Sequence, residues 1–241
     1  MVENAFGLPV GPPADLDLPR PRPPRTPMRG RTCSVVPVSP DHAEALHEAY
    51  AQEDGRNWTY LSLEPPRDAA EMRARLVAME ASEDPLYHTV LDAAGRPVGT
   101  CSYLRIAPEA ASVEVGWITW SPRLQRSVMS TEAMYLMMAR AFDELGYRRY
   151  EWKCDALNAP SRRAAERLGF TFEGIHRQAT VVKGRNRDTA WFSILDGEWP
   201  DRRARLAAWL DPANFDGDGR QRRPLGSYSA APGAGLERGL S

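Results

Sequence analysis

The chain has almost no lysine, and it lacks a long apolar run. Of its 31 lysine and arginine residues only Lys153 and Lys183 are lysines, so arginine carries nearly all the positive charge. No apolar run approaches the roughly 20 residues that span a bilayer, and the N-terminus lacks the basic start and apolar core of a signal peptide. These absences predict a cytoplasmic protein that has no membrane partner.

Cysteine is also scarce. Cys33, Cys101 and Cys154 are an odd number of scattered thiols without metal-ligand spacing. This pattern favours reduced thiols in the core and predicts no metal site. The arginine-rich composition, with many alanines and prolines, is typical of a GC-rich bacterial genome.

The overall charge argues against whole classes of function. A formal net charge of −1 is not that of a dedicated nucleic-acid binder or of a polybasic membrane anchor. A nucleic-acid-binding module between Arg202 and Arg223 is a weak alternative, because that segment also contains acidic and apolar residues. We therefore expect no nucleic acid among the partners.

The 241 residues suffice for one well-packed domain with extensions. Residues 1–29 hold eight prolines and predict an extended arm that lies on the domain or on a dimer neighbour. Residues 30–200 form the predicted main domain and 201–213 a C-terminal helix. The Gly-, Arg-, Ser- and Pro-rich residues 214–241 predict a flexible tail.

Hydrophobic periodicity within the main domain predicts strands separated by helices. The clearest helix, residues 131–145, has a broad apolar face rich in methionine and ends at Gly146. The strand that follows alternates buried Tyr150, Trp152 and Cys154 with charged residues. The fold class is an α/β, or layered α+β, domain. The other expected strands are 32–38, 87–91, 97–106, 113–120, 172–182 and 188–195, and the other helices are 41–52, 68–81 and one that opens at Asn158-Ala-Pro-Ser161.

The stretch from Trp117 to Gly174 is the most informative part of the chain. A basic loop, Ser121–Ser130, links a strand to a helix that is expected to begin at Thr131. A helix in that position points its free N–H groups and the positive end of its dipole beyond the end of the strand. Such a helix start can bind phosphate. Asn158-Ala-Pro-Ser161 opens the next helix, and Gly169-Phe170 follows it.

Over roughly residues 30 to 200 these features resemble the GNAT acyltransferases, in their RimJ/RimL-like branch. The resemblance implies a mixed, mostly antiparallel sheet that is splayed near its middle, with helices on both faces. It also implies acetyl-CoA or another acyl-CoA as co-substrate. The residues that match the family's coenzyme A site are Gln125, Arg126, Ser127, Val128, Met129, Ser130, Thr131 and Asn158. For Asn158, a contact with the pantetheine arm or the loop and an ordinary Asx turn before a helix are equal alternatives. Val128 and Ser130 depart from the family's small residues, and a β-branched Val disfavours the positive φ that a Gly would adopt.

The catalytic residues are inferred in the same way. In the family, the serine that matches Ser161 is thought to protonate the departing thiolate; the alternative is that Ser161 only caps its helix. Thr180 stands where relatives use a Glu base, so we take Glu114 as the candidate base, with an exposed or salt-bridged strand Glu as the equal alternative. His176 is the other titratable candidate. Trp58, Tyr60 and Tyr87 are candidates for the wall of an acceptor pocket, and aromatic packing against the sheet explains them equally.

The sequence thus predicts an acyl-CoA-dependent N-acyltransferase, with N-acetyl transfer the expected reaction. Its expected partner is a primary amine of a small molecule or of a peptide or protein N-terminus, and a homodimer is left open. The alternative is a catalytically silent acyl-CoA-binding or regulatory protein, which the departures at Val128, Ser130 and Thr180 keep open.

Overall fold

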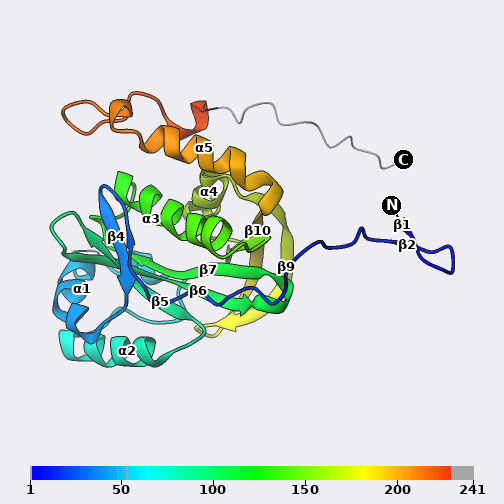
Figure 1. Cartoon of the computed structure of the whole chain (residues 1–241). Helices are drawn as coiled ribbons and strands as arrows, with labels where there is room; N and C mark the ends of the chain where they lie inside the picture. The colour runs from blue at the N-terminus through cyan, green and yellow to red at the C-terminus, as the bar shows by residue number, and fades with distance from the viewer. Residues whose placement is uncertain (1, 53, 229–241) are drawn as a thin grey trace.

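The computed structural model describes residues 2–52 and 54–228. An eight-stranded mixed sheet forms its centre (Figure 1). The strand order is β3-β4-β5-β6-β7-β8-β10-β9, and every neighbouring pair is antiparallel except β7 and β8. The strands are β3 (Met28–Arg29), β4 (Cys33–Pro37), β5 (Leu86–Asp92), β6 (Pro97–Ala107), β7 (Ser112–Trp120), β8 (Arg149–Asp155), β9 (Thr171–Val182) and β10 (Arg185–Leu195).

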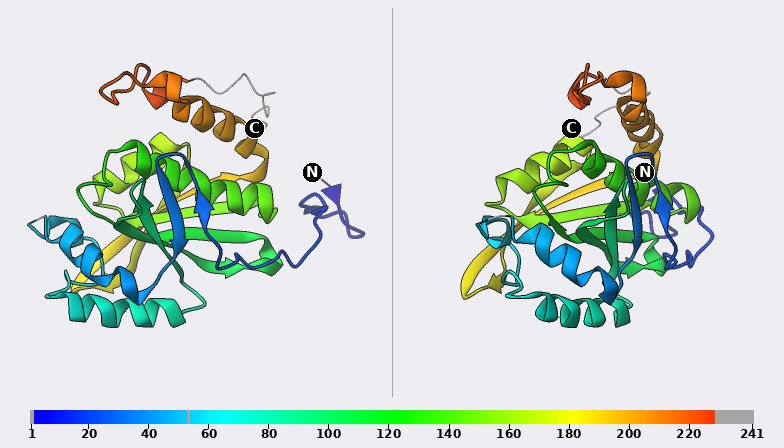
Figure 2. Two further views of the ribbon diagram at one scale, coloured as in Figure 1. Left: turned by 60° about the vertical axis from the view of Figure 1, so that its left-hand side comes forward. Right: turned by 90° about the vertical axis from the view of Figure 1, so that its left-hand side faces the viewer.

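Helices cover both faces of this sheet, as predicted. The helices α1 (Ala43–Tyr50) and α2 (Ala69–Ala81) lie on one face, and α3 (Val128–Ala139), α4 (Ala159–Leu168) and α5 (Trp199–Leu210) lie on the other (Figures 1 and 2). Short 3-10 helices occupy Pro40–His42, Arg56–Trp58, Pro108–Ala110, Asp196–Glu198, Pro212–Asn214 and Leu225–Ser227. In the described residues, no helix is long and apolar enough to cross a bilayer.

Two hydrophobic cores hold the layers together. The larger core lies between the sheet and α3–α5 and contains Met134, Tyr150 and Phe192. The smaller one lies under α1 and α2 and contains Leu46 and Leu76. All three cysteines are buried and free, which agrees with the expectation of core thiols.

The alternation predicted for residues 149–154 is present in β8. Tyr150, Trp152 and Cys154 are buried on the α3 side, whereas Arg149, Glu151 and Lys153 are only partly buried on the opposite face. Because α1 and α2 cover mainly the β4–β7 half of the sheet (Figure 1), this charged side of β8 is left without a helix over it.

Helix α3 differs at both ends from the helix expected over residues 131–145. Helix α3 begins at Val128 instead of Thr131, because the Ser127 hydroxyl oxygen accepts from Ser130 N–H at 3.2 Å and caps the helix three residues earlier. Its last turn, Arg140–Glu144, is a π-helix.

The segment 214–228 is not the flexible tail that composition suggested. Leu225 is buried, and the buried Asn214 side chain donates to the Trp209 carbonyl oxygen at 3.0 Å. These contacts pack the segment against α5. The rest of the expected tail, residues 229–241, lies outside the described residues.

The N-terminal arm is extended where it touches the domain. Arg20 N–H donates to the Pro108 carbonyl oxygen at 3.1 Å, and Met28–Arg29 pairs with β4. At its far end the arm forms a small hairpin of β1 (Val2–Glu3) and β2 (Pro9–Val10), which stands away from the body in Figure 2.

Candidate active site

The parallel strands β7 and β8 separate part of the way along their length. They pair only between Ser112–Val115 and Arg149–Trp152, although β7 continues to Trp120 and β8 to Asp155. Trp117 has a φ of 50°, and the β6–β7 register shifts beside it, as at a β-bulge. The bulge bends β7, so that beyond Val115 the backbone edges of the two strands face a gap.

The N-terminus of α3 follows β7 directly. With Ser127 as the cap and Val128 as the first helical residue, the N–H groups of Val128 and Met129 have no acceptor within the helix. The left-handed residue is Arg126, with a φ of 55°. Val128 is helical, so the positive φ that the family comparison placed at this position is not required there.

Most polar side chains of this loop brace it internally. Gln125 Nε2 donates to the Trp120 carbonyl oxygen at 2.8 Å, Ser127 Oγ to that of Leu124 at 2.6 Å, and Ser130 Oγ to that of Ser127 at 2.7 Å. Thr131 Oγ1 accepts from Arg167 Nη1 at 2.9 Å, which ties α3 to α4. Seven of the eight predicted cofactor residues thus lie in this loop and at the start of α3, and these four side chains hold the loop in shape.

Two arginines of the loop have a different character. Arg123 and Arg126 are exposed, and neither makes an ion pair within the described part of the chain. Their charges lie in the same loop as the two free N–H groups of α3. Together they make the start of α3 electropositive.

Helix α4 begins on the other side of the gap. The Asn158 side chain caps it by accepting from Ser161 N–H at 3.1 Å, so Asn158 is the cap. The alternative in which Ser161 caps the helix is wrong. Ser161 Oγ instead accepts from Trp152 Nε1 on β8 at 3.0 Å. Sequence reasoning assigned Trp152 to the core and missed this contact, which joins a strand to a helix.

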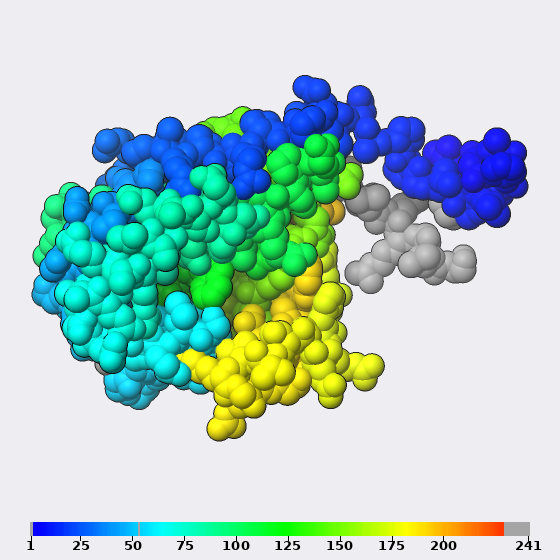
Figure 3. Space-filling view, turned by 90° about the horizontal axis from the view of Figure 1, so that it is seen from below, coloured from blue at the N-terminus to red at the C-terminus, as the bar shows by residue number. Residues whose placement is uncertain are grey.

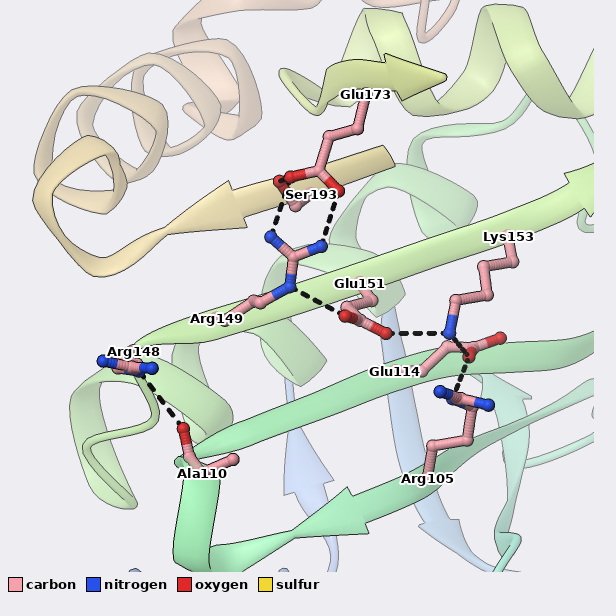
Figure 4. Close-up of polar contacts among 9 residues, drawn as sticks. All are labelled: Arg105, Ala110, Glu114, Arg148, Arg149, Glu151, Lys153, Glu173 and Ser193. Carbon is pink, nitrogen blue, oxygen red and sulfur yellow. Dashed lines mark hydrogen bonds and ion pairs between the residues drawn. The ribbon is translucent and has the colours of Figure 1, made fainter. Parts of the chain in front are cut away.

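The buried Glu114 side chain lies in an ionic network on the opposite side of the sheet (Figure 4). Lys153 Nζ is 2.8 Å from Glu114 Oε2 and 2.8 Å from Glu151 Oε2, and Arg105 Nε is 3.5 Å from Glu114 Oε2. The network continues through Arg149 to Glu173, which also accepts from Ser193 Oγ. The alternative of a salt-bridged strand Glu thus describes the contacts of Glu114 correctly.

The pKa values of the two carboxylates that share Lys153 are shifted in opposite directions. Burial raises the pKa of Glu114, although Lys153 and Arg105 oppose that shift. Burial also acts on Glu151, but hydrogen bonds from Lys153 and Arg149 leave its pKa below the usual value. Both ion pairs of Glu114 use its Oε2 atom. The other carboxylate oxygen, Oε1, lies beside Gly116, 3.5 Å from the position that a Cβ atom would take there. Gly116 is the first residue beyond the paired part of β7.

The loop between α1 and α2 closes the gap from the side. Tyr60 OH donates to the Leu157 carbonyl oxygen at 3.1 Å, and Lys183 Nζ donates to the Trp58 carbonyl oxygen at 2.9 Å and pairs with Glu64 at 3.0 Å. Figure 3 shows a hollow between this part of the molecule, in cyan, and the yellow β9–β10 hairpin. A cavity beside α1 and α2 is lined by Tyr50, Trp58, Met72, Arg75, Trp117 and Thr119.

The remaining sequence candidates occupy different places. Trp58 lines the cavity, whereas Tyr87 packs against Trp117 with ring centroids 6.4 Å apart. His176 stacks on Trp191 at 4.5 Å, and Thr180 is exposed on β9. Lys153, which the alternation assigned only to the open face of its strand, also lies over the Trp191 ring, 3.5 Å from its centroid.

Comparison with known proteins identifies this arrangement. Residues 34–171 match the family model described as an acetyltransferase (GNAT) domain. A GCN5-related N-acetyltransferase from Brucella melitensis has a crystal structure that is 46% identical, with a TM-score of 0.86 over 88% of this chain and 97% of the other. A probable acetyltransferase of the GNAT family from Chromobacterium violaceum is 37% identical, with a TM-score of 0.74 over 80% and 98%.

A curated relative is more distant. An uncharacterized N-acetyltransferase, p20, from Bacillus licheniformis is 25% identical over 145 residues, which are 58% of this chain and 80% of the relative. Since the family model alone matches more than half of the residues, the protein belongs to the GNAT family of acetyltransferases, enzymes that use acetyl-CoA as co-substrate.

Proposed function

We propose that this acetyltransferase belongs to the RimJ/RimL-like branch and transfers an acyl group to a primary amine of a small molecule or of a peptide or protein N-terminus. The observation that carries the proposal is the gap between β7 and β8, with the N-terminus of α3 on one side and that of α4 on the other. The match of Asn158-Ala-Pro-Ser161 and Gly169-Phe170 to the branch's sequence pattern supports the finer assignment.

The start of α3 has the properties required to bind the pyrophosphate of an acyl-CoA. Backbone N–H groups supply most phosphate contacts at such helix starts, and those of Val128 and Met129 are free of helical acceptors. Arg123 and Arg126 add positive charge. Gln125, Ser127, Ser130 and Thr131 hold the loop in the shape that presents these groups.

Ser161 is proposed as the proton donor to the departing thiolate. An indole N–H can only donate, so the bond from Trp152 occupies a lone pair of the Ser161 oxygen and does not use the hydroxyl proton, for which the Cys154 sulfur is one acceptor. The same bond fixes the hydroxyl position at the edge of the gap. Asn158 supports this arrangement by capping α4, and it is proposed to line the path of the pantetheine arm.

Glu114 is proposed as the general base, directly or through a water molecule. Its raised pKa brings the carboxylate closer to the range in which it can accept a proton from an amine. Lys153 and Arg105 hold Oε2, and Oε1 lies on the side of Gly116, where the gap begins. Lys153 is accordingly a positioning residue.

The proposal is tested by combining binding with turnover. Calorimetry with acetyl-CoA measures binding, and thiol release with a panel of amines and N-terminal peptides measures transfer; succinyl-CoA and other acyl-CoAs extend the panel. We expect both binding and amine-dependent thiol release. Binding without release for every amine tested would replace the proposal with the silent acyl-CoA-binding protein.

A further inference from the structure

The N-terminal hairpin has a defined structure without a supporting surface. Among the described residues, the hydrogen bonds of segment 2–10 all stay inside the hairpin: Asn4 N–H donates to the Leu8 carbonyl oxygen at 2.9 Å, and the Asn4 side chain accepts from Phe6 and Leu8 N–H. Phe6 is 86% exposed and Leu8 is 59% exposed. Because an isolated two-stranded hairpin is marginal in water, these apolar side chains are expected to be covered by another surface.

The connection keeps this hairpin away from its own domain. The arm reaches the domain at Arg20, whose N–H binds the Pro108 carbonyl oxygen. Between the hairpin and that contact lie Pro12, Pro13 and Pro19, which stiffen the chain in an extended form. In the two perpendicular views of Figures 1 and 3 the hairpin stands clear of the body.

The arm also carries charge of one sign. Residues 2–19 contain Glu3, Asp15 and Asp17 and no lysine or arginine. We call residues 2–19 the acidic arm. A surface that suits it offers exposed apolar side chains together with positive charge.

The outer part of the β9–β10 hairpin has these properties. Residues 174–187, which we call the basic hairpin, contain Arg177, Lys183, Arg185 and Arg187 and no aspartate or glutamate. Lys183 is already paired with Glu64, whereas Arg177 and Arg185 are exposed. Ile175 is 38% exposed and Val181 is 71% exposed. Strand β9 is also the last strand of the sheet, so one of its edges has no strand partner in the described structure.

We propose that the acidic arm of one copy docks on the basic hairpin of a second copy, so that two chains exchange arms in a symmetric homodimer. The charge complementarity lies within one sequence, and a two-fold axis forms the contact twice. Figure 3 supports a partner in trans, since the arm and the yellow basic hairpin leave the body at separate places. The exchange covers Phe6 and Leu8 and supplies a neighbour for the exposed β9.

Sedimentation velocity on the full chain over a range of concentrations tests the dimer. We expect wild type to reach twice the chain mass of 26.9 kDa. Asp15→Arg/Asp17→Arg and Arg177→Glu/Arg185→Glu should each raise the dimer dissociation constant at least about tenfold, because each places like charges together. All four side chains are exposed. The wild-type dimer should weaken as salt is added.

The decisive variant carries both double changes, since the reversed arm then meets a reversed hairpin. Restoration of the dimer in this fourfold variant is expected, and misfolding cannot produce it. Glu48→Arg/Glu80→Arg makes the same charge change as the arm variant at exposed sites on α1 and α2, and it should leave the dimer unchanged. A wild type that stays monomeric at every concentration would overturn the proposal. So would a dimer that neither double variant weakens, or a fourfold variant that stays monomeric.

Discussion

Replacing Ser161 by alanine separates catalysis from stability, because the structure assigns its hydroxyl to a bond with Trp152 and not to the cap of α4. Trp152 is 5% exposed, and its Nε1 donates to Ser161 Oγ at 3.0 Å. Ser161→Ala leaves this buried donor unpaired, at a cost of about 1–3 kcal/mol. For a chain of this length that cost lowers the melting temperature by roughly 2–12 °C. The Asn158 cap uses the Ser161 backbone N–H and remains intact.

The effect of Ser161→Ala on transfer follows from the timing of the proton donation. A donor to the thiolate acts in the transition state, so acetyl-CoA binding should be preserved while the transfer rate falls by about 10²- to 10⁴-fold. The measurement is single-turnover transfer at saturating acetyl-CoA, with a melting curve for each variant.

Two further variants serve as matched controls for this measurement. Trp152→Phe removes the indole donor and keeps the Ser161 hydroxyl, so it should lose stability but lower the transfer rate less than Ser161→Ala does. Asn158→Ala removes the helix cap, worth about 1 kcal/mol. If Ser161→Ala is destabilised yet transfers at the wild-type rate, Ser161 serves only to pair Trp152, and the proposed proton donation is refuted.

Three other predictions address phosphate binding, stability and pH dependence. Arg126→Glu should raise the dissociation constant of acetyl-CoA, measured by calorimetry at low salt, on the order of tenfold or more. An unchanged dissociation constant would show that this loop does not bind acetyl-CoA. Glu132→Ala should lower the free energy of unfolding, measured with denaturant, by about 3 kcal/mol or more, because the carboxylate of this buried residue accepts from the N–H groups of residues 31–33. An unchanged free energy of unfolding would contradict this prediction. If ionised Glu114 is the base, turnover falls as the pH drops through its raised pKa. Lys153→Met removes a cation that lowers this pKa, so the acidic limb of the pH–rate profile should move to higher pH. An acidic limb that does not move would exclude Glu114 as the base.

Features set by neighbouring residues could be read from the sequence. Asp68 was expected at the start of a helix, and its side chain accepts from Glu71 N–H at 2.7 Å as a cap. The alternation in β8 separated its buried aromatic residues from its charged ones. In both cases the signal lies within a few residues, so periodicity and capping preferences suffice.

Features that depend on distant residues could not be read in this way. The segment 214–228 was expected to be flexible from its composition, but Leu225 is buried against the main core and Asn214 binds the end of α5. The start of α3 is an exception, since it was placed three residues late although its cap is local: the Ser127 side chain accepts from Ser130 N–H. The required left-handed residue is Arg126, which no composition rule singles out.

The environment of Glu114 shows most clearly what the sequence leaves open. Lys153 is 39 positions away along the chain, and it reaches Glu114 because parallel pairing sets Glu114 opposite Glu151 on the neighbouring strand. A shift of one residue in that register would turn these side chains to opposite faces of the sheet. The buried ion pair, the raised pKa and the position of Oε1 beside Gly116 therefore depend on the four residue pairs that β7 and β8 form before they separate. The same short parallel ladder thus sets both the gap that is proposed to receive the acyl group and the position of the carboxylate that is proposed to activate the amine.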